Sequence, residues 1–397
     1  MTPHGILMVT GAYWPELSGG GLQCRTMIHA LKDTFRFRVF TTCTDRSLPT
    51  QDVIEGVAVT RAHVDAGSIM TKLGAAWATI VFFARHHSTF DIVHLHGFSQ
   101  KSVLMVLLAR LFAKKVVITI HTAGQDEPDA IRRQGWLAFK CYANADRFIA
   151  ISPAMAESFR RSPLASERLV LVPNAVETNR FAPLAAEDRA QLRDALHLAP
   201  SDTPWILFVG FFSHDKGPRI LFDAWLRLID AGLQCALVFV GASASSYREV
   251  DPAIAEGIRR DTARRGLERL VHFAGLVGDV ERYYQSADVY AMPSLREAFG
   301  MSLVEAMATA VPVVATRIPG VTDEIVADGV TGVLVEPRDV AGLAAAIERL
   351  LRNPSAAAAM GERARLDATD RFGLARRRDQ WVAVYGGLYD RHHSKRQ

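Results

Sequence analysis

The stretch PSLREAFGMSLVEAMA, residues 293–308, decides the class of fold to which this chain belongs. It follows a short apolar run, residues 289–292, that is typical of a buried strand, and its second half has the composition of a helix. Glu297 lies in the intervening loop, Gly300 opens the helix, and Glu305 falls in its second turn. The segment is therefore predicted to form a strand, a loop and a helix, the repeating unit of an α/β sheet.

The two glutamates of this unit stand on either side of the start of the helix. Eight residues of continuous helix rise about 12 Å, so Glu297 and Glu305 bracket the helix start instead of sharing a proton. The exposed N–H groups between them and the positive end of the helix dipole suit a phosphate. This arrangement fits a molecule with hydroxyls at both ends and an anion in the middle, such as a nucleotide sugar. The structural alternative is an ordinary surface helix with a capped N-terminus, in which the two glutamates bind no ligand.

The same alternation of short apolar runs and amphipathic segments extends along nearly the whole chain, as in parallel strands covered by crossover helices. A length of 397 residues exceeds the roughly 250–300 residues at which one hydrophobic core stops growing. We therefore expect two doubly wound α/β domains. Their predicted strands are residues 6–10, 38–42, 57–61, 92–95, 116–120, 148–151 and 169–172, then 205–209, 236–240, 271–273, 289–292, 313–315 and 333–335.

The predicted domains are divided by a change in composition. We expect an N-terminal, acceptor-binding Rossmann-like domain over residues 1–182 and a C-terminal, donor-binding Rossmann-like domain over residues 204–373. The linker, residues 183–203, is polar and alanine-rich, and it ends in the turn signals of residues 200–204, PSDTP. The remainder, residues 374–397, is expected to form a helix that returns to the first domain. Ligands of such sheets lie at the carboxyl ends of the strands, so a cleft between the domains is expected.

Composition excludes several classes of protein. Hydrophobic residues make up 49% and charged residues 22% of the chain, which is ordinary for a globular protein. The four cysteines lie far apart without a Cys-x-x-Cys pair or a His/Cys cluster, so neither a disulfide framework nor a structural metal is expected. The N-terminus lacks the features of a signal peptide, and the longest apolar stretch, residues 103–113, is too short to span a membrane. A cytoplasmic location is therefore expected.

Charge is distributed unevenly along the chain. Residues 1–172 hold 19 Lys and Arg against 13 Asp and Glu, a net +6, whereas the remainder holds 27 against 29, a net −2. The basic clusters lack interleaved aromatic residues and the signatures of zinc fingers, RRM or KH modules, so no nucleic-acid partner is expected. An anionic membrane surface or an anionic substrate fits the basic half better.

Together with several other segments, the Glu-x7-Glu segment resembles the retaining glycosyltransferases of family 4. Two of these segments are PVVA, residues 312–315, and EIVADGVTG, residues 324–332. The upstream matches are the glycine cluster Gly19-Gly20-Gly21, His121 after its strand, Val172-Pro173-Asn174, Gly210 followed by Lys216-Gly217, and Val240-Gly241. The resemblance covers nearly the whole chain and implies the GT-B fold of two facing Rossmann-like domains.

The resemblance also implies roles for individual residues. The implied catalytic residues are His121 beside the donor sugar, Glu297 on the sugar hydroxyls and Lys216 on the leaving diphosphate. Further donor contacts are expected from Gly20, Gly21, Gly210, Gly241, Gly300, Met301, Ser302 and, on the ribose hydroxyls, Glu305. Acceptor contacts are expected from Gly19 and Asn174. His96 is also predicted to contact the acceptor, because His94 and His96 flank Leu95 in a predicted strand; the alternative is that these histidines are core residues. The early glycines let the backbone approach a ligand closely, and the lack of a full Gly-x-Gly-x-x-Gly motif argues against a dinucleotide site.

Three positions depart from the family pattern. Phe211 stands where many members have Arg, so one expected phosphate cation is missing. Ala175 and Ala310 stand where Gly is usual, and both are interpreted as tolerated backbone substitutions. His214 is the nearest substitute for the missing cation and is therefore predicted to bind the donor, with Arg219 as the second candidate. The alternative is that His214 is a solvated loop residue.

The expected activity is transfer of a sugar from a nucleotide-sugar donor to a saccharide or lipid-linked acceptor. The resemblance implies retention at the anomeric carbon and a place in bacterial-type polysaccharide or glycoconjugate synthesis. The sequence contains no Asp-x-Asp motif, so no metal or other cofactor is expected, and Lys216 with helix N-termini would neutralise the diphosphate. The alternatives are a nucleotide-sugar epimerase of the same fold, which needs no acceptor, and a non-catalytic nucleotide-sugar binder.

One segment of the first domain combines apolar and basic residues at helical spacing, as helices at membrane interfaces do. It contains Trp77, Ile80, Val81, Phe82 and Phe83 beside Lys72, Arg85, His86 and His87, with Lys114 and Lys115 as a second basic site. We therefore expect a peripheral contact with the inner face of the plasma membrane. A core helix with a solvated end is the alternative.

Overall fold

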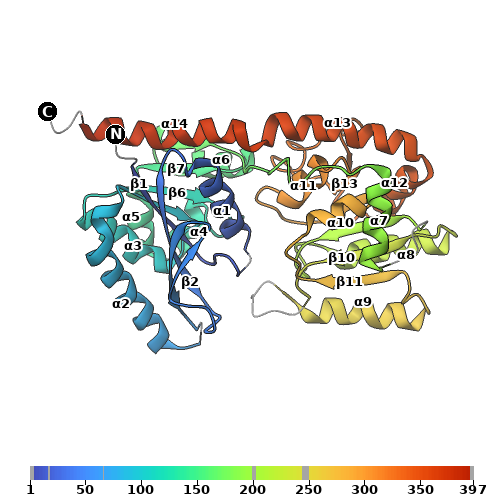
Figure 1. Ribbon diagram of the computed structural model, residues 1–397, viewed down its shortest axis with the longest axis horizontal. Coiled ribbons are helices and arrows are strands. Elements are labelled where there is room, and N and C mark those ends of the chain that lie inside the picture. The colour runs from blue at the N-terminus through green and yellow to red at the C-terminus, as the bar shows by residue number, and fades with distance from the viewer. Residues whose placement is uncertain (1–3, 17, 66, 199–202, 244–249, 394–397) are drawn as a thin grey trace. The chain divides into compact units, whose positions relative to one another are not determined.

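The computed structural model describes residues 4–16, 18–65, 67–198, 203–243 and 250–393. Within them the chain forms two compact units, each built on its own parallel sheet (Figure 1). Unit 1 contains the residues up to Ala175 together with the last helix, and unit 2 contains Val176–Gly373. Two doubly wound α/β units are the architecture predicted from the alternation of apolar runs.

Unit 1 alternates strands and helices from its first residues. Its strands are β1 (Gly5–Thr10), β2 (Arg36–Cys43), β3 (Gln51–Ile54), β4 (Val57–His63), β5 (Ile92–His96), β6 (Lys115–Ile120), β7 (Arg147–Ala150) and β8 (Leu169–Leu171). Its helices are α1 (Gly19–Leu31), α2 (Ile69–His86), α3 (Gln100–Leu111), α4 (Pro128–Arg133), α5 (Trp136–Ala143), α6 (Pro153–Arg160) and α14 (Leu374–His393), with 3-10 turns η1 (His87–Thr89) and η2 (Ser166–Arg168). The strand order is β3-β4-β2-β1-β5-β6-β7-β8, and among these described strands only β3 pairs antiparallel with its neighbour.

One face of this sheet is covered by α1 and by α14, the last helix of the sequence. Ile28 and Leu31 of α1 pack with Trp381, Tyr385 and Leu388 of α14 over the apolar side chains of the strands. Tyr385 is fully buried, and its ring stands at an edge-to-face angle to that of another core aromatic. A segment from the far end of the sequence therefore completes the core of unit 1.

Unit 2 follows the same plan with a smaller sheet. Its strands are β9 (Trp205–Val209), β10 (Ala236–Val240), β11 (Val271–Gly275), β12 (Val289–Met292), β13 (Val313–Thr316) and β14 (Val333–Val335). Its helices are α7 (Ala186–Leu196), α8 (Pro218–Asp230), α9 (Pro252–Arg264), α10 (Glu281–Ser286), α11 (Met301–Ala308), α12 (Val340–Arg352) and α13 (Pro354–Phe372). The strands lie in the order β11-β10-β9-β12-β13-β14, and all of them are parallel. From β9 the chain first adds β10 and β11 on one side and then returns to add β12, β13 and β14 on the other, so the direction in which strands are added reverses between β9 and β12.

The reversal between β9 and β12 determines where a ligand of unit 2 should bind. Strands β9 and β12 are almost wholly buried because helices cover both faces of the sheet, and the apolar stripe of α8 (Leu221, Phe222, Trp225 and Leu228) packs on one of these faces. The loops that leave β9 and β12 emerge side by side at the carboxyl ends of the strands. In open α/β sheets this point, where the order reverses, is where ligands bind.

The chain divides between Ala175 and Val176, not after residue 182 as expected. Val176 is already tied to unit 2, because its N–H donates to the carbonyl of Phe372 at 2.9 Å. The carbonyl of Ala182 likewise accepts a 2.9 Å hydrogen bond from the side chain of Gln285. These contacts hold residues 176–182 against unit 2.

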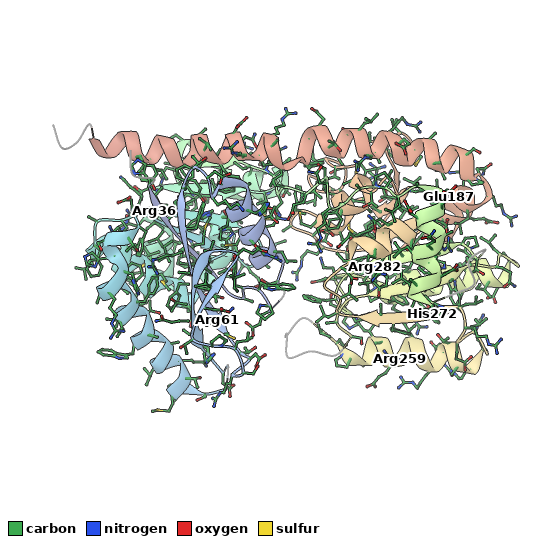
Figure 2. The ribbon with its side chains drawn as sticks, in the orientation of Figure 1. Arg36, Arg61, Glu187, Arg259, His272 and Arg282 are labelled. Carbon is green, nitrogen blue, oxygen red and sulfur yellow. The ribbon has the colours of Figure 1, made fainter. Side chains whose placement is uncertain are left out.

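The predicted linker, residues 183–203, differs from expectation because it contains a helix of unit 2. Arg189 and Arg193 of α7 make ion pairs of 2.6 and 3.2 Å with the two carboxylate oxygens of Asp288. Figure 2 shows Glu187 in the first turn of α7 and Arg282 on α10, the helix against which α7 packs. The polar composition reflects a surface helix in which Arg193 is the one buried residue. Residues 200–202 of the predicted turn lie outside the described residues.

The α2 helix presents an apolar stripe to solvent. Met70, Leu73 and Trp77 expose 73%, 60% and 67% of their surface, and Ile69 and Ile80 continue the stripe at 71% and 39%. We call these five side chains the α2 stripe. Their spacing of three to four residues places them on one side of the helix.

Part of the expected composition of the segment that was predicted to contact a membrane was wrong. Phe82 and Phe83 are buried on the opposite side of α2, at 4% and 0% exposure, where they pack with Phe90. Lys115 forms a 3.3 Å ion pair with Asp146. Within the described residues, no helix has the length and apolar character needed to cross a bilayer.

Candidate active site

In unit 2, the loops that leave β9 and β12 meet through an ion pair. Nζ of Lys216 lies 2.7 Å from Oε1 of Glu297, and the hydroxyl of Ser294 donates to the same oxygen at 2.9 Å. The Glu297 side chain is 8% exposed, whereas that of Lys216 is 33% exposed. The structure therefore holds a buried carboxylate in place and leaves its cationic partner partly accessible.

The close approach of these loops requires a glycine next to Lys216. Gly217 adopts φ +68°, and a Cβ at this position would stand 2.3 Å from the carbonyl oxygen of Pro293. No L side chain fits there without displacing the backbone of the β12 loop. Gly217 thus brings Lys216 within reach of Glu297, which lies 81 residues later in the chain.

Two more predicted glycines lie at neighbouring strand ends. Gly241 adopts φ +138°, and a Cβ there would stand 2.0 Å from the carbonyl oxygen of Gly210. The N–H of Gly210 donates to the carbonyl of Val240 at 2.9 Å. A Cβ on Gly210 would in turn lie 3.9 Å from the Lys216 side chain. At the ends of β9 and β10, the chain beside Lys216 therefore consists of glycine backbone without side chains.

The helix that follows Glu297, α11, begins at Met301 directly after its N-cap Gly300, which agrees with the prediction that Gly300 opens it. Gly300 adopts φ +101° at the N-cap of α11, where no side chain caps the helix. Met301 and Ser302 form the first turn, so their backbone N–H groups lie at the positive end of the helix dipole. This helix start is suited to a phosphate or to sugar hydroxyls.

Glu305 lies in the second turn of α11 and is mostly buried. Its Oε2 accepts a 3.0 Å hydrogen bond from the hydroxyl of Tyr284, which belongs to α10. Burial raises the pKa of Glu305 to about 7, because desolvation of the carboxylate outweighs the hydrogen bond from Tyr284. Sequence reasoning identified Glu305 but missed Tyr284, since no spacing rule relates a residue of α10 to one of α11.

In unit 1, the predicted glycine cluster opens α1. The side chain of Ser18 caps the helix by accepting a 3.0 Å hydrogen bond from the N–H of Gly21. A Cβ on Gly21 would stand 2.3 Å from the carbonyl oxygen of Ala12, whereas one on Gly20 would lie 3.9 Å from Cδ2 of His121. The structure therefore places Gly20 against His121, and Gly19 has no neighbour within 4 Å of the corresponding point.

His121 follows β6 and is held by a buried carboxylate that sequence reasoning missed. Oδ2 of Asp126 accepts hydrogen bonds from the N–H groups of His121 and Thr122 at 2.9 and 2.8 Å, and Oδ1 accepts one from Phe98 at 3.0 Å. Burial raises the pKa of Asp126 to about 6 although these bonds oppose the shift. Desolvation lowers the pKa of His121 to about 4, so its imidazole is neutral at pH 7.

The two histidines of β5 have different partners. His94 is fully buried between the hydroxyls of Tyr385 and Thr119, each 2.7 Å from one of its ring nitrogens. Nδ1 of His96 instead lies 3.0 Å from Nε2 of His121. His96 is 8% exposed, so the structure places it against His121 and beneath the surface of the unit.

Asn174 and His121 line the same small pocket of unit 1, together with Gln23 of α1 and Trp381 of α14. Gln23 fixes the backbone beside Asn174: its Nε2 donates to the carbonyl of Ala175 at 3.3 Å, and its Oε1 accepts from the N–H of Ala175 at 3.2 Å. Both bonds involve only the backbone of Ala175, so its methyl group does not interfere with them.

The two substitutes proposed for the missing arginine lie elsewhere in unit 2. The side chain of His214 is 85% exposed, with Nε2 3.5 Å from Oδ2 of Asp251. Arg219 forms ion pairs with Asp223 and Asp261. Among the described residues, neither His214 nor Arg219 has a hydrogen bond or ion pair with the residues that surround Glu297. Compensation for Phe211 stays a prediction.

Within the part of the chain that the structure describes, no group of three or more His, Cys, Asp or Glu side chains is arranged to hold a metal ion. The predicted residues instead form two groups. One, in unit 2, contains Lys216, Glu297, Glu305 and the glycines around them. The other, in unit 1, contains Gly20, His96, His121 and Asn174.

Each of the two units matches the model of a known protein family. The model described as glycosyl transferase 4-like domain matches residues 18–175, and that described as glycosyl transferases group 1 matches residues 203–353. The D-inositol 3-phosphate glycosyltransferase of Actinosynnema mirum is 30% identical over 378 residues, covering 89% of this chain and 88% of the relative. That of Xylanimonas cellulosilytica is 31% identical over 386 residues, covering 89% and 85%.

Solved structures show the same fold. The Anabaena protein HepE in complex with UDP-glucose superposes with a TM-score of 0.79 at 21% identity, covering 96% of this chain and 99% of HepE. A sucrose-phosphate synthase from Thermosynechococcus elongatus superposes with a TM-score of 0.80 at 23% identity, covering 98% and 99%. These similarities show the GT-B fold expected from the sequence.

Proposed function

Because the chain belongs to the group 1 glycosyltransferases of family 4, we propose that it transfers a sugar from a nucleotide sugar to a saccharide or lipid-linked acceptor with retention of configuration. The observation that carries this proposal is the Lys216–Glu297 ion pair beside the start of α11. The curated relatives are transferases, which does not favour an epimerase. A place in polysaccharide or glycoconjugate synthesis is part of the same proposal.

The geometry of unit 2 suits the binding of a nucleotide diphosphate sugar. Lys216 has further N–H donors besides the one directed at Glu297, and it would bind the diphosphate together with the N–H groups that open α11. Glu297, fixed by Lys216 and Ser294, would accept hydrogen bonds from the sugar hydroxyls. Glu305 would do the same for the ribose. HepE binds UDP-glucose, so a uridine nucleotide is the first donor to test.

Transfer with retention would proceed by attack of the acceptor hydroxyl on the face from which the diphosphate leaves. The glycosidic bond breaks ahead of bond formation through an oxocarbenium-like transition state, and the leaving diphosphate takes the proton of the acceptor. Preorganised positive charge at the diphosphate is the largest catalytic contribution expected of the protein. Lys216 and the α11 dipole supply that charge, so we propose that no metal ion is needed.

A peripheral contact of unit 1 with an anionic membrane at the cytoplasmic face is part of the proposal. The α2 stripe offers exposed Trp and aliphatic side chains on one helix, and Lys72 and Arg85 of the same helix are exposed. Helices of this composition lie in the interface of a bilayer. Such a contact would bring a lipid-linked acceptor to unit 1.

The test is an assay of the full chain with UDP-glucose and other nucleotide sugars, with and without acceptors that include inositol 3-phosphate and simple saccharides. NMR of the product reports its anomeric configuration. We expect acceptor-dependent turnover, a retained anomeric configuration and full activity in EDTA. Turnover without an acceptor would show an epimerase, an inverted product would overturn retention, and loss of activity restored only by one metal would overturn metal independence.

Variants of the ion pair connect this activity to the site. Lys216→Met and Glu297→Gln are each expected to lower kcat at least about a hundredfold, the typical cost of removing one preorganised catalytic contact. Arg296→Gln is the matched control, because Arg296 neighbours Glu297 but pairs with Asp215 at the surface. Wild-type kcat in both ion-pair variants would rule out this site.

A further inference from the structure

The short contact between His96 and His121 joins two neighbouring strands of unit 1. His96 is the last residue of β5, and His121 directly follows β6, which pairs with β5 in parallel. Nδ1 of His96 and Nε2 of His121 are 3.0 Å apart, and the two rings are inclined by only 15°. Two neutral imidazoles at this distance share one hydrogen, so one ring must be the donor and the other the acceptor.

The position of that hydrogen follows from the other nitrogen of His96. Its Nε2 is buried and has no hydrogen-bond partner among the described residues. If Nε2 carried the hydrogen of His96, an N–H group would be buried without an acceptor, an arrangement that folded proteins rarely tolerate. With the hydrogen on Nδ1, His96 donates to Nε2 of His121, and its own Nε2 is a buried acceptor without a partner among the described residues.

We propose that His96 is a positioning residue that fixes the orientation and tautomer of His121. Since Nε2 of His121 accepts from His96, the hydrogen of His121 resides on Nδ1. Nδ1 has no partner among the described residues and is the only nitrogen of His121 left to meet a ligand. His121 therefore offers an N–H donor to an oxygen of the substrate and has no free lone pair with which to remove a proton.

The consequence for catalysis rests on the proposed transferase function. A donor-only His121 hydrogen bonds a hydroxyl or phosphate oxygen and leaves deprotonation of the acceptor to the diphosphate. It also changes the role of His96 from a contact with the acceptor to a residue that acts through His121. The lowered pKa values of both histidines, caused first by burial, are consistent with neutral rings.

The tautomer is tested on the ligand-free full chain, independently of any activity. Long-range proton–nitrogen NMR of histidine-labelled protein at pH 7.5 distinguishes a protonated from an unprotonated ring nitrogen. The signals of His121 are assigned by their loss in His121→Phe. We expect a protonated Nδ1 and an unprotonated Nε2 for His121; the reverse pattern would overturn the proposal, whether or not the chain transfers sugar.

Two substitutions at His96 then separate positioning from packing. In His96→Asn, the side-chain amide can donate as Nδ1–H does, so we expect kcat within threefold of wild type and the same His121 tautomer. In His96→Leu the donor is lost, and we expect kcat to fall at least about tenfold with donor KM within twofold, as for a catalytic group that loses its orientation. Equal kcat in the two variants would overturn the positioning role.

The matched control is Tyr385→Phe, which removes the hydrogen bond to His94 in the same strand and leaves the His96–His121 pair intact. This variant should lower stability while keeping kcat and the His121 tautomer. A kcat loss equal to that of His96→Leu would assign both effects to packing. If His96→Leu fails to fold, His96→Gln replaces it, because the longer glutamine side chain does not place its amide where Nδ1 of His96 lies. The positioning role then requires the expected tautomer in the wild-type spectrum and a kcat loss of at least about tenfold in His96→Gln.

Discussion

Glu305 makes the stability of unit 2 depend on pH. Its pKa rises from an ordinary value of 4.5 to about 7 in the folded protein because the carboxyl is buried. Between these values the folded state holds the proton while the unfolded state has released it, so stability falls as pH rises from about 5 to 7. The full effect is at most about 3 kcal/mol.

Glu305→Gln keeps the shape of the protonated carboxyl and removes this penalty. In urea unfolding we expect the variant to be close to wild type in stability at pH 5 and more stable by about 2–3 kcal/mol at pH 8. Glu336→Gln is the control, since that side chain is 73% exposed and should give the same difference at both pH values. A Glu305→Gln difference that does not change with pH would contradict the assignment.

At the residue scale, the sequence predicted which residues carry charge to the site but not how they are held. The Glu-x7-Glu spacing placed Glu297 before α11 and Glu305 within it, and the structure agrees. The Lys216–Glu297 ion pair joins loops 81 residues apart, so no local pattern contains it. Asp126 was missed for a similar reason: its function depends on three backbone N–H groups, which no side-chain motif records.

At the scale of elements, the membrane contact proposed for unit 1 depends on α2. The full chain should sediment with vesicles that contain anionic lipid and less with neutral ones. Leu73→Glu with Trp77→Glu should weaken partitioning at least about tenfold, because two apolar side chains are lost and two negative charges face the lipid. Leu366→Glu is the control, since Leu366 of α13 is 71% exposed but lies in unit 2. Equal binding by all variants would eliminate the α2 stripe as the contact.

Most of the strands that sequence reasoning predicted correctly are buried on both faces. All of the predicted strands exist, since a continuous apolar run has few alternatives in a parallel sheet. The strand that was missed, β3, lies at the sheet edge and pairs antiparallel with β4; its sequence QDVI has no continuous apolar run, and its residues alternate between exposed and half-buried. Helix α7 was interpreted as a linker because its only buried side chain is Arg193, which pairs with Asp288.

At the scale of the whole molecule, the last helix of the sequence is required for the first unit. Trp381, Val384, Tyr385 and Leu388 of α14 are each at most 8% exposed and belong to the core of unit 1. Burying a large apolar side chain contributes roughly 1.5–3 kcal/mol, so these four amount to about the total stability of a domain, 5–15 kcal/mol. Unit 1 therefore should not fold from residues 1–175 alone.

We predict that a chain ending at Gly373 loses the cooperative unfolding of unit 1 and keeps that of unit 2. Unit 2 should survive because its core is drawn from residues 206–360 and none of it lies in α14. Calorimetry should then show one transition, and limited proteolysis should leave a protected fragment within residues 176–373. Leu388→Ala in the full chain serves as the graded case, in which unit 1 alone should lose about 2–5 kcal/mol. A truncated chain that retains both transitions would show that unit 1 folds without α14. It would also show that unit 1 does not need the hydrogen bond between Tyr385 and His94.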